Sequence, residues 1–247
     1  MPDPDVRPAD EPAGTVDQLT ALGALAEPNR RALYDHVAAA GDWVSRDQAA
    51  DAVGLERGTA AHHLDRLAAD GLLDVDFRRL SGRSGPGAGR PAKLYRRSRR
   101  ELGVSLPPRD YALAGQLLAE AADRARAEGL DIDRALDDAA RAHGEQLADE
   151  MRARLAGADR RGTSAAARRR AVVDVLDMHG FAPDDREGTI VLRNCPFHRL
   201  AQRHRDLICG MNLCLLGAAV ESVDGTGLVA RLEPAEDLCC VRLHSAP

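Results

Sequence analysis

The chain contains 247 residues, of which 44% are hydrophobic, and this is enough for two ordinary domains that each bury a core. No apolar run is long enough to cross a bilayer, which takes about 18 residues or more. The first residues lack the positive and apolar regions of a secretory signal, so we expect a cytoplasmic protein. The formal net charge of -5 argues against a nucleic-acid partner only if the charge is evenly distributed.

The N-terminal part of the chain predicts a tail followed by helices. Residues 1–14 are rich in proline and aspartate and lack periodicity, so we expect a disordered tail. Apolar residues recur at helical spacing over about 16–40, and Pro28 divides this stretch into two helices. A short helix over 46–52 and a longer one over 56–70 then predict a helix-turn-helix.

A basic hairpin is predicted directly after these helices. Two alternating segments, 72–80 and 92–97, have the pattern of strands and are joined by the glycine-rich loop SGRSGPGAGR. Between residues 78 and 100 there are nine basic residues and no acidic one. Because such a run of cations repels itself unless a polyanion is present, the hairpin is predicted to be a wing that contacts DNA.

The helix over 56–70 is predicted to be the recognition helix that enters the major groove. Ala60, Leu64 and Leu67 recur on one face and should pack against the preceding helices. His63 borders this apolar face, so partial burial and DNA contact are equally expected alternatives for its side chain. The predicted DNA-binding residues of the helix and the hairpin are Arg57, Thr59, His62, His63, Arg66, Arg83, Arg90, Lys93 and Arg96.

The rest of the chain is predicted to form a helical region and a small α+β domain. Two long amphipathic helices, over about 109–128 and 131–156, are followed by a short linker. The later elements are a helix over 165–179, a strand over 188–193, helices within 197–222, and strands over 227–233 and 238–243. The predicted fold class is therefore α+β, with a tail 1–14, a winged helix-turn-helix domain 15–100, a helical dimerisation region 101–160 and a sensor domain 161–247.

All five cysteines lie beyond residue 194. In a reducing compartment this clustering favours metal or redox chemistry over structural disulfides. Thirteen residues separate Cys195 from Cys209. Cys239 and Cys240 belong to a predicted terminal strand whose alternation puts Cys239 on the core side. The CxxC pairs that are typical of structural zinc sites are missing.

Cys214, His198 and His204 are candidates for a fourth ligand. Cys214 lies in the apolar run MNLCLLGAAV, which favours a buried small hydrophobe over a ligand. For the two histidines, solvated helix faces are the favoured interpretation. An acidic residue or an external thiol are the remaining alternatives.

Three segments, LGALAEPNRRALYDHV, HHLDRLAADGLL and GRPAKLYR, resemble the winged helix-turn-helix of the ArsR-like bacterial transcriptional regulators. The resemblance covers residues 17–97 and implies a homodimer that binds a double-stranded DNA operator. Many of these regulators carry a metal-binding cysteine motif on the recognition helix. That motif is missing here, because residues 41–71 contain no cysteine.

The segment RNCPFHRLA resembles the SufR-like branch of these regulators, in which three spaced cysteines hold an iron–sulfur cluster. The resemblance implies Cys195, Cys209 and one of Cys239 and Cys240 as cluster ligands. Soft thiolates that converge from separate elements suit such a cluster. We therefore expect a repressor that senses iron or redox state.

Other functions were weighed against this one. A winged-helix regulator of the same kind would sense a small organic ligand, or bind zinc in place of the cluster. A thiol enzyme would use Cys195 as nucleophile and His198 or His204 as base. No glycine-rich phosphate loop, HExxH or GxSxG motif accompanies these residues, so we expect no catalysis. Without a long apolar run, we also expect no membrane partner.

Overall fold

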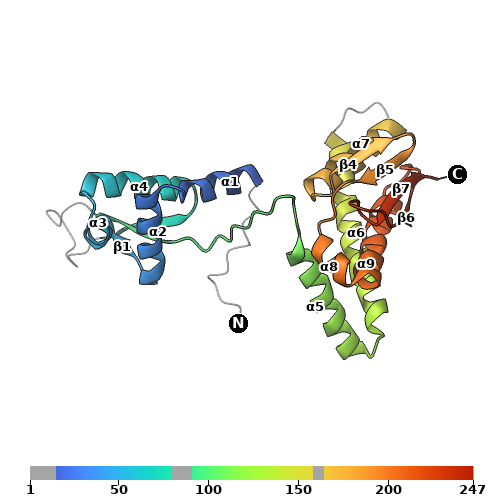
Figure 1. Cartoon of the computed structure of the whole chain (residues 1–247), viewed down its shortest axis with the longest axis horizontal. Coiled ribbons are helices and arrows are strands. Elements are labelled where there is room, and N and C mark those ends of the chain that lie inside the picture. The colour runs from blue at the N-terminus through green and yellow to red at the C-terminus, as the bar shows by residue number, and fades with distance from the viewer. Residues whose placement is uncertain (1–14, 79–90, 158–163, 247) are drawn as a thin grey trace. The chain divides into compact units, whose positions relative to one another are not determined.

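The computed structural model describes residues 15–78, 91–157 and 164–246 of the chain (Figure 1). Its contacts divide the chain into two units, Met1–Val104 and Ser105–Pro247. Each unit combines helices with a small antiparallel sheet, which confirms the predicted α+β class. The predicted tail and the loop between the two wing strands lie outside the described residues.

The first unit packs its helices against a three-stranded sheet of order β1-β3-β2. Its core includes Leu33 and Val37 from one helix and Leu64 and Leu67 from another. Its described elements are α1 (Thr15–Ala24), α2 (Pro28–Ala40), β1 (Val44–Ser45), α3 (Arg46–Val53), α4 (Arg57–Ala69), β2 (Leu73–Arg78) and β3 (Ala92–Arg97).

Local signals explain where the two helices of the helix-turn-helix begin and end. Ser45 caps α3, because its hydroxyl accepts a hydrogen bond from the Gln48 backbone N–H at 3.3 Å. The Gln48 side chain in turn accepts from the Ser45 N–H at 2.9 Å, which completes a capping box. Gly54 then adopts a left-handed φ of 70°, which ends α3 and allows α4 to start three residues later.

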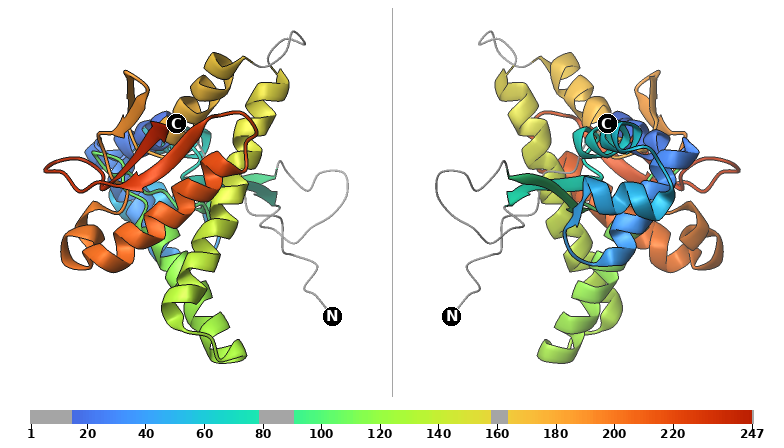
Figure 2. Two further views of the ribbon diagram at one scale, coloured as in Figure 1. Left: turned by 90° about the vertical axis from the view of Figure 1, so that its right-hand side faces the viewer. Right: turned by 90° about the vertical axis from the view of Figure 1, so that its left-hand side faces the viewer.

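The second unit has a four-stranded antiparallel sheet of order β4-β5-β7-β6. The long helix α6 lies beside α9, as the views in Figures 1 and 2 show. The two backbones approach so closely that a methyl group at Gly144 would collide with the carbonyl oxygen of Leu215. The described elements are α5 (Tyr111–Glu128), α6 (Ile132–Gly157), α7 (Ala165–Met178), β4 (Pro183–Arg186), β5 (Thr189–Leu192), α8 (His198–Arg203), α9 (Arg205–Glu221), β6 (Leu228–Leu232) and β7 (Val241–Ser245).

The two long helices α5 and α6 share a core with the rest of the second unit. Leu117 of α5 and Leu136 of α6 belong to the same buried cluster as Val172 of α7 and Leu215 of α9. The sequence separates these helices from the C-terminal elements at a linker near residue 160. In the structure the packing joins α5 and α6 to those elements in one unit.

Two strands were not predicted, and one predicted strand starts later than expected. The unpredicted strands are the short β1 and β4. The terminal strand β7 begins at Val241, so Cys239 and Cys240 precede it and the prediction that they lie on the strand is wrong. The cause is visible at Asp237, where a φ of 57° turns the chain away from the extended conformation.

Candidate DNA-contacting surface and cysteine site

The recognition helix α4 has one face in the core and one face in solvent. Ala60, Leu64 and Leu67 are each 0% exposed, as the helical spacing predicts. Thr59, His62 and Arg66 are exposed, and their spacing of three and four residues brings them to one side of the helix. Arg57 is exposed at the first position of the same helix.

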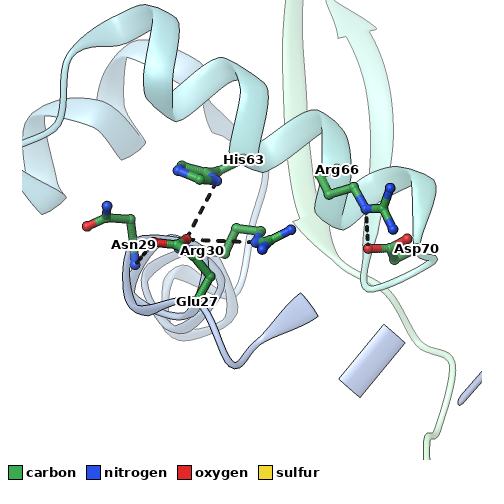
Figure 3. Close-up of polar contacts among 6 residues, drawn as sticks. All are labelled: Glu27, Asn29, Arg30, His63, Arg66 and Asp70. Atoms are coloured by element: carbon green, nitrogen blue, oxygen red, sulfur yellow. Dashed lines mark hydrogen bonds and ion pairs between the residues drawn. The ribbon is translucent and has the colours of Figure 1, made fainter. Parts of the chain in front are cut away.

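His63 contacts α2 instead of facing outward with its neighbours. Its side chain is 15% exposed, and its Nδ1 lies 3.6 Å from the Glu27 carboxylate (Figure 3). Glu27 is the N-cap of α2 and accepts from the backbone N–H groups of Asn29 at 3.1 Å and Arg30 at 2.7 Å. Mainly because of the Arg30 N–H, the pKa of Glu27 lies below its usual value. His63 therefore connects the recognition helix to the start of α2.

The outward arginines of α4 are paired with nearby carboxylates. Arg57 Nε lies 2.6 Å from Asp47 of α3. Arg66 Nε donates to Asp70 at 2.9 Å, one helical turn further along (Figure 3). The Arg57–Asp47 pair is exposed, and because exposed ion pairs contribute only about 0–1 kcal/mol, a DNA phosphate can replace this carboxylate partner at little cost.

A second set of contacts joins α4 to the wing strand β3. Asp65 accepts hydrogen bonds from Lys93 Nζ and from the Tyr95 hydroxyl, both at 2.6 Å. Burial opposes the ionisation of Asp65, but these two donors and the lysine charge keep its pKa below the usual value. Tyr95 is 0% exposed, so Asp65 is the polar partner that its buried hydroxyl requires. Lys93, a predicted DNA contact, is held in this bridge.

Trp43 organises the base of the wing. The guanidinium of Arg96 lies 4.6 Å and that of Arg78 lies 4.9 Å from the centre of its ring. Both are cation–π distances. The same arginines also form ion pairs, Arg96 with Asp74 at 3.4 Å and Arg78 with Asp76 at 2.6 Å. Sequence reasoning did not single out Trp43, although its place as the one tryptophan, just before a strand that pairs with the wing, was the available signal.

The charge of the wing is therefore lower than its cation run implies. Asp74 and Asp76 come from the opposing strand β2, and Asp65 comes from α4. Each of these aspartates forms an ion pair with a basic residue that a count of charges along the sequence leaves unpaired. Arg83 and Arg90, which the sequence places on the wing loop, lie outside the described residues.

In the second unit, four cysteines from three segments come together. Cys195 follows β5, Cys209 lies in α9, and Cys239 and Cys240 precede β7. The Cys195 thiol shares a hydrogen bond with Cys239, and Cys209 shares one with Cys240. Electrostatic interactions also link the two pairs, between Cys195 and Cys209 and between Cys239 and Cys240. Cys195, Cys209 and Cys239 are buried, and Cys240 is partly exposed.

The four thiols have unequal acidity. The hydrogen bond from Cys239 lowers the pKa of Cys195, and the Phe197 backbone N–H and the Arg109 charge add to this effect against the cost of burial. The hydrogen bond with Cys195 and burial raise the pKa of Cys239. Burial, followed by the hydrogen bond with Cys240, raises the pKa of Cys209 to about 12. Cys195 is thus the thiol of its pair that ionises first.

The environment of Cys239 includes a buried amide. Asn212 of α9 is 2% exposed and its Nδ2 donates to Cys239 Sγ at 3.3 Å. The backbone N–H of Cys239 donates to Leu192 O at 2.9 Å, which ties it to the end of β5. These contacts place Cys239 on the buried side, as predicted, although the residue lies in a loop.

The other candidate ligands face elsewhere. Cys214 is partly buried on α9, and burial, followed by a hydrogen bond to Asp137 of α6, raises its pKa to about 11. His198 Nε2 is 2.9 Å from the Gln202 amide one turn along α8. His204 is exposed between α8 and α9. Their functions as ligands stay predictions.

Over the part of the chain that the structure describes, no group of three or more His, Cys, Asp or Glu side chains has the arrangement to hold a metal ion. The four cysteines lie near one another without forming such a group. The thiols contact one another in pairs, whereas ligands of one ion must surround a shared point.

The described helices include none long and apolar enough to span a membrane.

Comparison with known proteins finds a match to the family model of a helix-turn-helix domain over residues 25–76. No curated protein and no solved structure matches the chain. The matched residues contain α2, α3, α4 and most of β2, and the hairpin of β2 and β3 supplies the wing. The chain thus carries a winged helix-turn-helix, the DNA-binding domain of a transcriptional regulator.

Proposed function

We propose that the protein is a homodimeric repressor whose operator binding responds to an iron–sulfur cluster held by Cys195, Cys209 and one of Cys239 and Cys240. The observation that carries this proposal is the convergence of these thiols from three separate segments. The cluster would supply a centre that is gained, lost or oxidised as iron and oxygen change. The residues of the chain supply the ligands and connect them to DNA binding.

For the DNA-binding half, the support is the exposed side of α4 and the basic hairpin. Thr59, His62 and Arg66 lie on the side of the recognition helix that a major groove would meet. Arg96 and Arg78 lie over the Trp43 ring at the base of the wing, and their charges would attract phosphates. A homodimer would present two such surfaces to a two-fold operator.

For the sensing half, the support is the chemistry and position of the donors. Thiolates are the ligands that iron–sulfur clusters require, and the lowered pKa of Cys195 favours its thiolate. Cys239 and Cys240 lie in a loop between β6 and β7 and not on the strand itself. The paired thiols must separate to surround a cluster, and a loop can make that movement more easily than a paired strand.

The deciding experiment is an iron and sulfide assay on the full-length protein, purified without oxygen from iron-replete cells. Cys195→Ser and Cys209→Ser should abolish iron retention and the visible absorbance, because a hydroxyl is a far poorer partner for iron than a thiolate. Cys239→Ser should be more damaging than Cys240→Ser, since Cys239 is 1% exposed and contacts Cys195. Cys214→Ser is the matched control and should retain iron, since this thiol faces Asp137. Wild-type protein without iron would overturn the proposal.

A second function is favoured by the direct contact within the thiol pairs. Oxidation of the neighbouring thiols Cys195 and Cys239 to a disulfide would transfer two electrons to a peroxide, and both thiol protons would leave with the peroxide oxygens as water. The same holds for Cys209 and Cys240. Iron-free protein whose DNA binding still changes on peroxide treatment, together with loss of two free thiols per pair, would transfer the sensing role to these disulfides.

A further inference from the structure

The segment that begins the second unit is attached to the cysteine loop. Asn194, next to Cys195, donates from its Nδ2 to the carbonyl oxygens of Pro108 at 2.8 Å and of Gly180 at 2.5 Å. In the opposite direction, Arg109 Nη1 donates to Cys195 O at 3.0 Å and to Asn194 Oδ1. Segments that are 85 residues apart in the chain are thereby joined.

Backbone contacts extend this attachment on both sides. The Asp110 N–H donates to Pro196 O at 3.1 Å, one residue beyond the cysteine. Asp110 is also the N-cap of α5, accepting from the Leu113 N–H at 2.8 Å. The start of α5 is therefore hydrogen-bonded to the loop that carries Cys195.

Gly180 allows the close approach of Pro108. A Cβ atom at Gly180 would lie 2.8 Å from Pro108 Cβ, closer than real side chains come, and the backbone φ is +78°. Both observations require glycine at this position. Pro108 is thus held between the Asn194 amide and the Gly180 backbone.

The position of this segment in the chain gives the attachment a consequence. The first unit ends at Val104 and the second begins at Ser105, so the chain from the DNA-binding unit passes directly into residues 105–110. Hydrogen bonds join Arg109 and Asp110 to the backbone at Cys195 and Pro196. The Arg109 bond to Cys195 O and the Asn194 bond to Gly180 O are part-buried, where competition from water is reduced.

We infer that Arg109 and Asn194 are positioning residues that couple the state of the cysteine site to the chain segment leading from the DNA-binding unit. The inference rests on the proposed function, because it needs a cysteine site with two states. It assigns to the asparagine before Cys195 a task distinct from ligation. Coupling of this kind requires that both sites bias the same structural element, which here is the start of α5.

The test uses full-length protein and a DNA duplex selected from a random library by the wild type. The dissociation constant is measured for protein loaded anaerobically with iron(II) and sulfide, and again after iron removal by a chelator. Typical allosteric coupling is about 5- to 150-fold, and we expect the wild-type ratio in this range. In Arg109→Ala and Asn194→Ala the ratio should fall to within about twofold of unity. Iron content should stay at the wild-type level in Asn194→Ala, which leaves the Arg109 charge beside Cys195 in place.

Two further variants separate coupling from general structural support. Arg109→Lys keeps a charged donor and should recover part of the ratio. Arg193→Ala removes a neighbouring arginine whose Nε binds Asp184 at 2.8 Å, and should keep the full ratio. Hydrogen exchange of the Asp110 amide should differ between loaded and iron-free wild type and should lose this difference in Asn194→Ala.

The outcomes distinguish this inference from the proposed function. A wild-type protein without iron or without a change in DNA affinity refutes the proposed function, and the coupling role falls with it. A responsive wild type with equally responsive Arg109→Ala and Asn194→Ala variants refutes the coupling role alone. Loss of iron in Asn194→Ala also refutes it, because the residue would then support the site itself.

Discussion

Replacement of Asp65 should destabilise the first unit, because it removes a hydrogen-bonded bridge between the recognition helix and the wing strand. The Tyr95 hydroxyl loses its charged acceptor while the residue stays buried, and hydrogen bonds to charged groups contribute about 1.5–3 kcal/mol. The ion pair with Lys93 is half-exposed and adds at most about 1 kcal/mol. Asp65→Ala should therefore lower the free energy of unfolding by about 2–3 kcal/mol.

Tyr95→Phe provides the second arm of a double-mutant cycle. It removes the donor together with its need for a partner, so it should cost about 1 kcal/mol. The Asp65→Ala/Tyr95→Phe double variant should then be more stable than the sum of the single losses implies, with a coupling energy of about 1–2 kcal/mol. Asp51→Ala, at an exposed aspartate of α3, is the charge-matched control and should change stability by less than about 0.5 kcal/mol.

Urea unfolding followed by tryptophan fluorescence measures these changes in the correct unit. The chain has one tryptophan, and Trp43 lies in the first unit, so its signal excludes unfolding of the second unit. Additive losses in the cycle, or an Asp65→Ala variant as stable as the control, would refute the reasoning.

The bridge also predicts a pH dependence. The folded-state pKa of Asp65 is below its unfolded value, so its contribution is present above the ordinary pKa of 3.8 and is lost as pH falls through the folded value. Wild-type stability should decline more steeply than that of Asp65→Asn as pH falls below 3.8. Parallel curves for the two proteins in this range would contradict the assignment.

Three further predictions concern DNA binding and packing. His62→Ala should weaken operator binding by about 1–3 kcal/mol with little effect on random DNA, and equal losses on both would show that the reading face is misplaced. Arg83→Ala with Arg90→Ala should weaken binding to all DNA and reduce the salt slope by about one per lost phosphate contact, whereas an unchanged slope argues against a backbone contact. Gly144→Leu should lower the melting temperature of the second unit more than Gly144→Ala does, because the larger leucine side chain must fit against Leu215 of α9. Equal melting temperatures of the two variants in calorimetry would contradict the close crossing of the helices.

The sequence predicted the helices of the first unit well because their limits are set by local chemistry. Proline at the start of α2 and the left-handed glycine at Gly54 each act on the adjacent turn and can be recognised without knowledge of the fold. The apolar side of α4 was predicted for the same reason, since three buried residues recur at helical spacing. His63 could not be resolved this way, because its partner Glu27 belongs to another helix.

The charge of the wing was overestimated because pairing across strands is not local. All charged residues between 78 and 100 are basic, whereas the strand register sets Asp74 of β2 opposite Arg96 of β3. Lys93 is neutralised by Asp65, which is 28 residues away on a helix. Clusters of like charge along one segment therefore predict an electrostatic surface only after the acids of neighbouring elements are counted.

The cysteine site shows the same limit, and it also shows what residue chemistry can predict. Residue chemistry predicted Cys195, Cys209, Cys239 and Cys240 as ligands, and the structure brings these four free thiols near one another. Their function as ligands stays a prediction. Strand alternation gave the correct burial for Cys239 but the wrong element, since the loop residues that follow the turn at Asp237 were predicted as the start of the strand. Periodicity reports which side of a segment is buried, and a short extended loop beside a sheet produces the same pattern as a strand. The contacts that give the site its surroundings, such as the bond from Asn212 to Cys239, join elements whose pairing depends on the whole fold, so they emerge only from the three-dimensional structure.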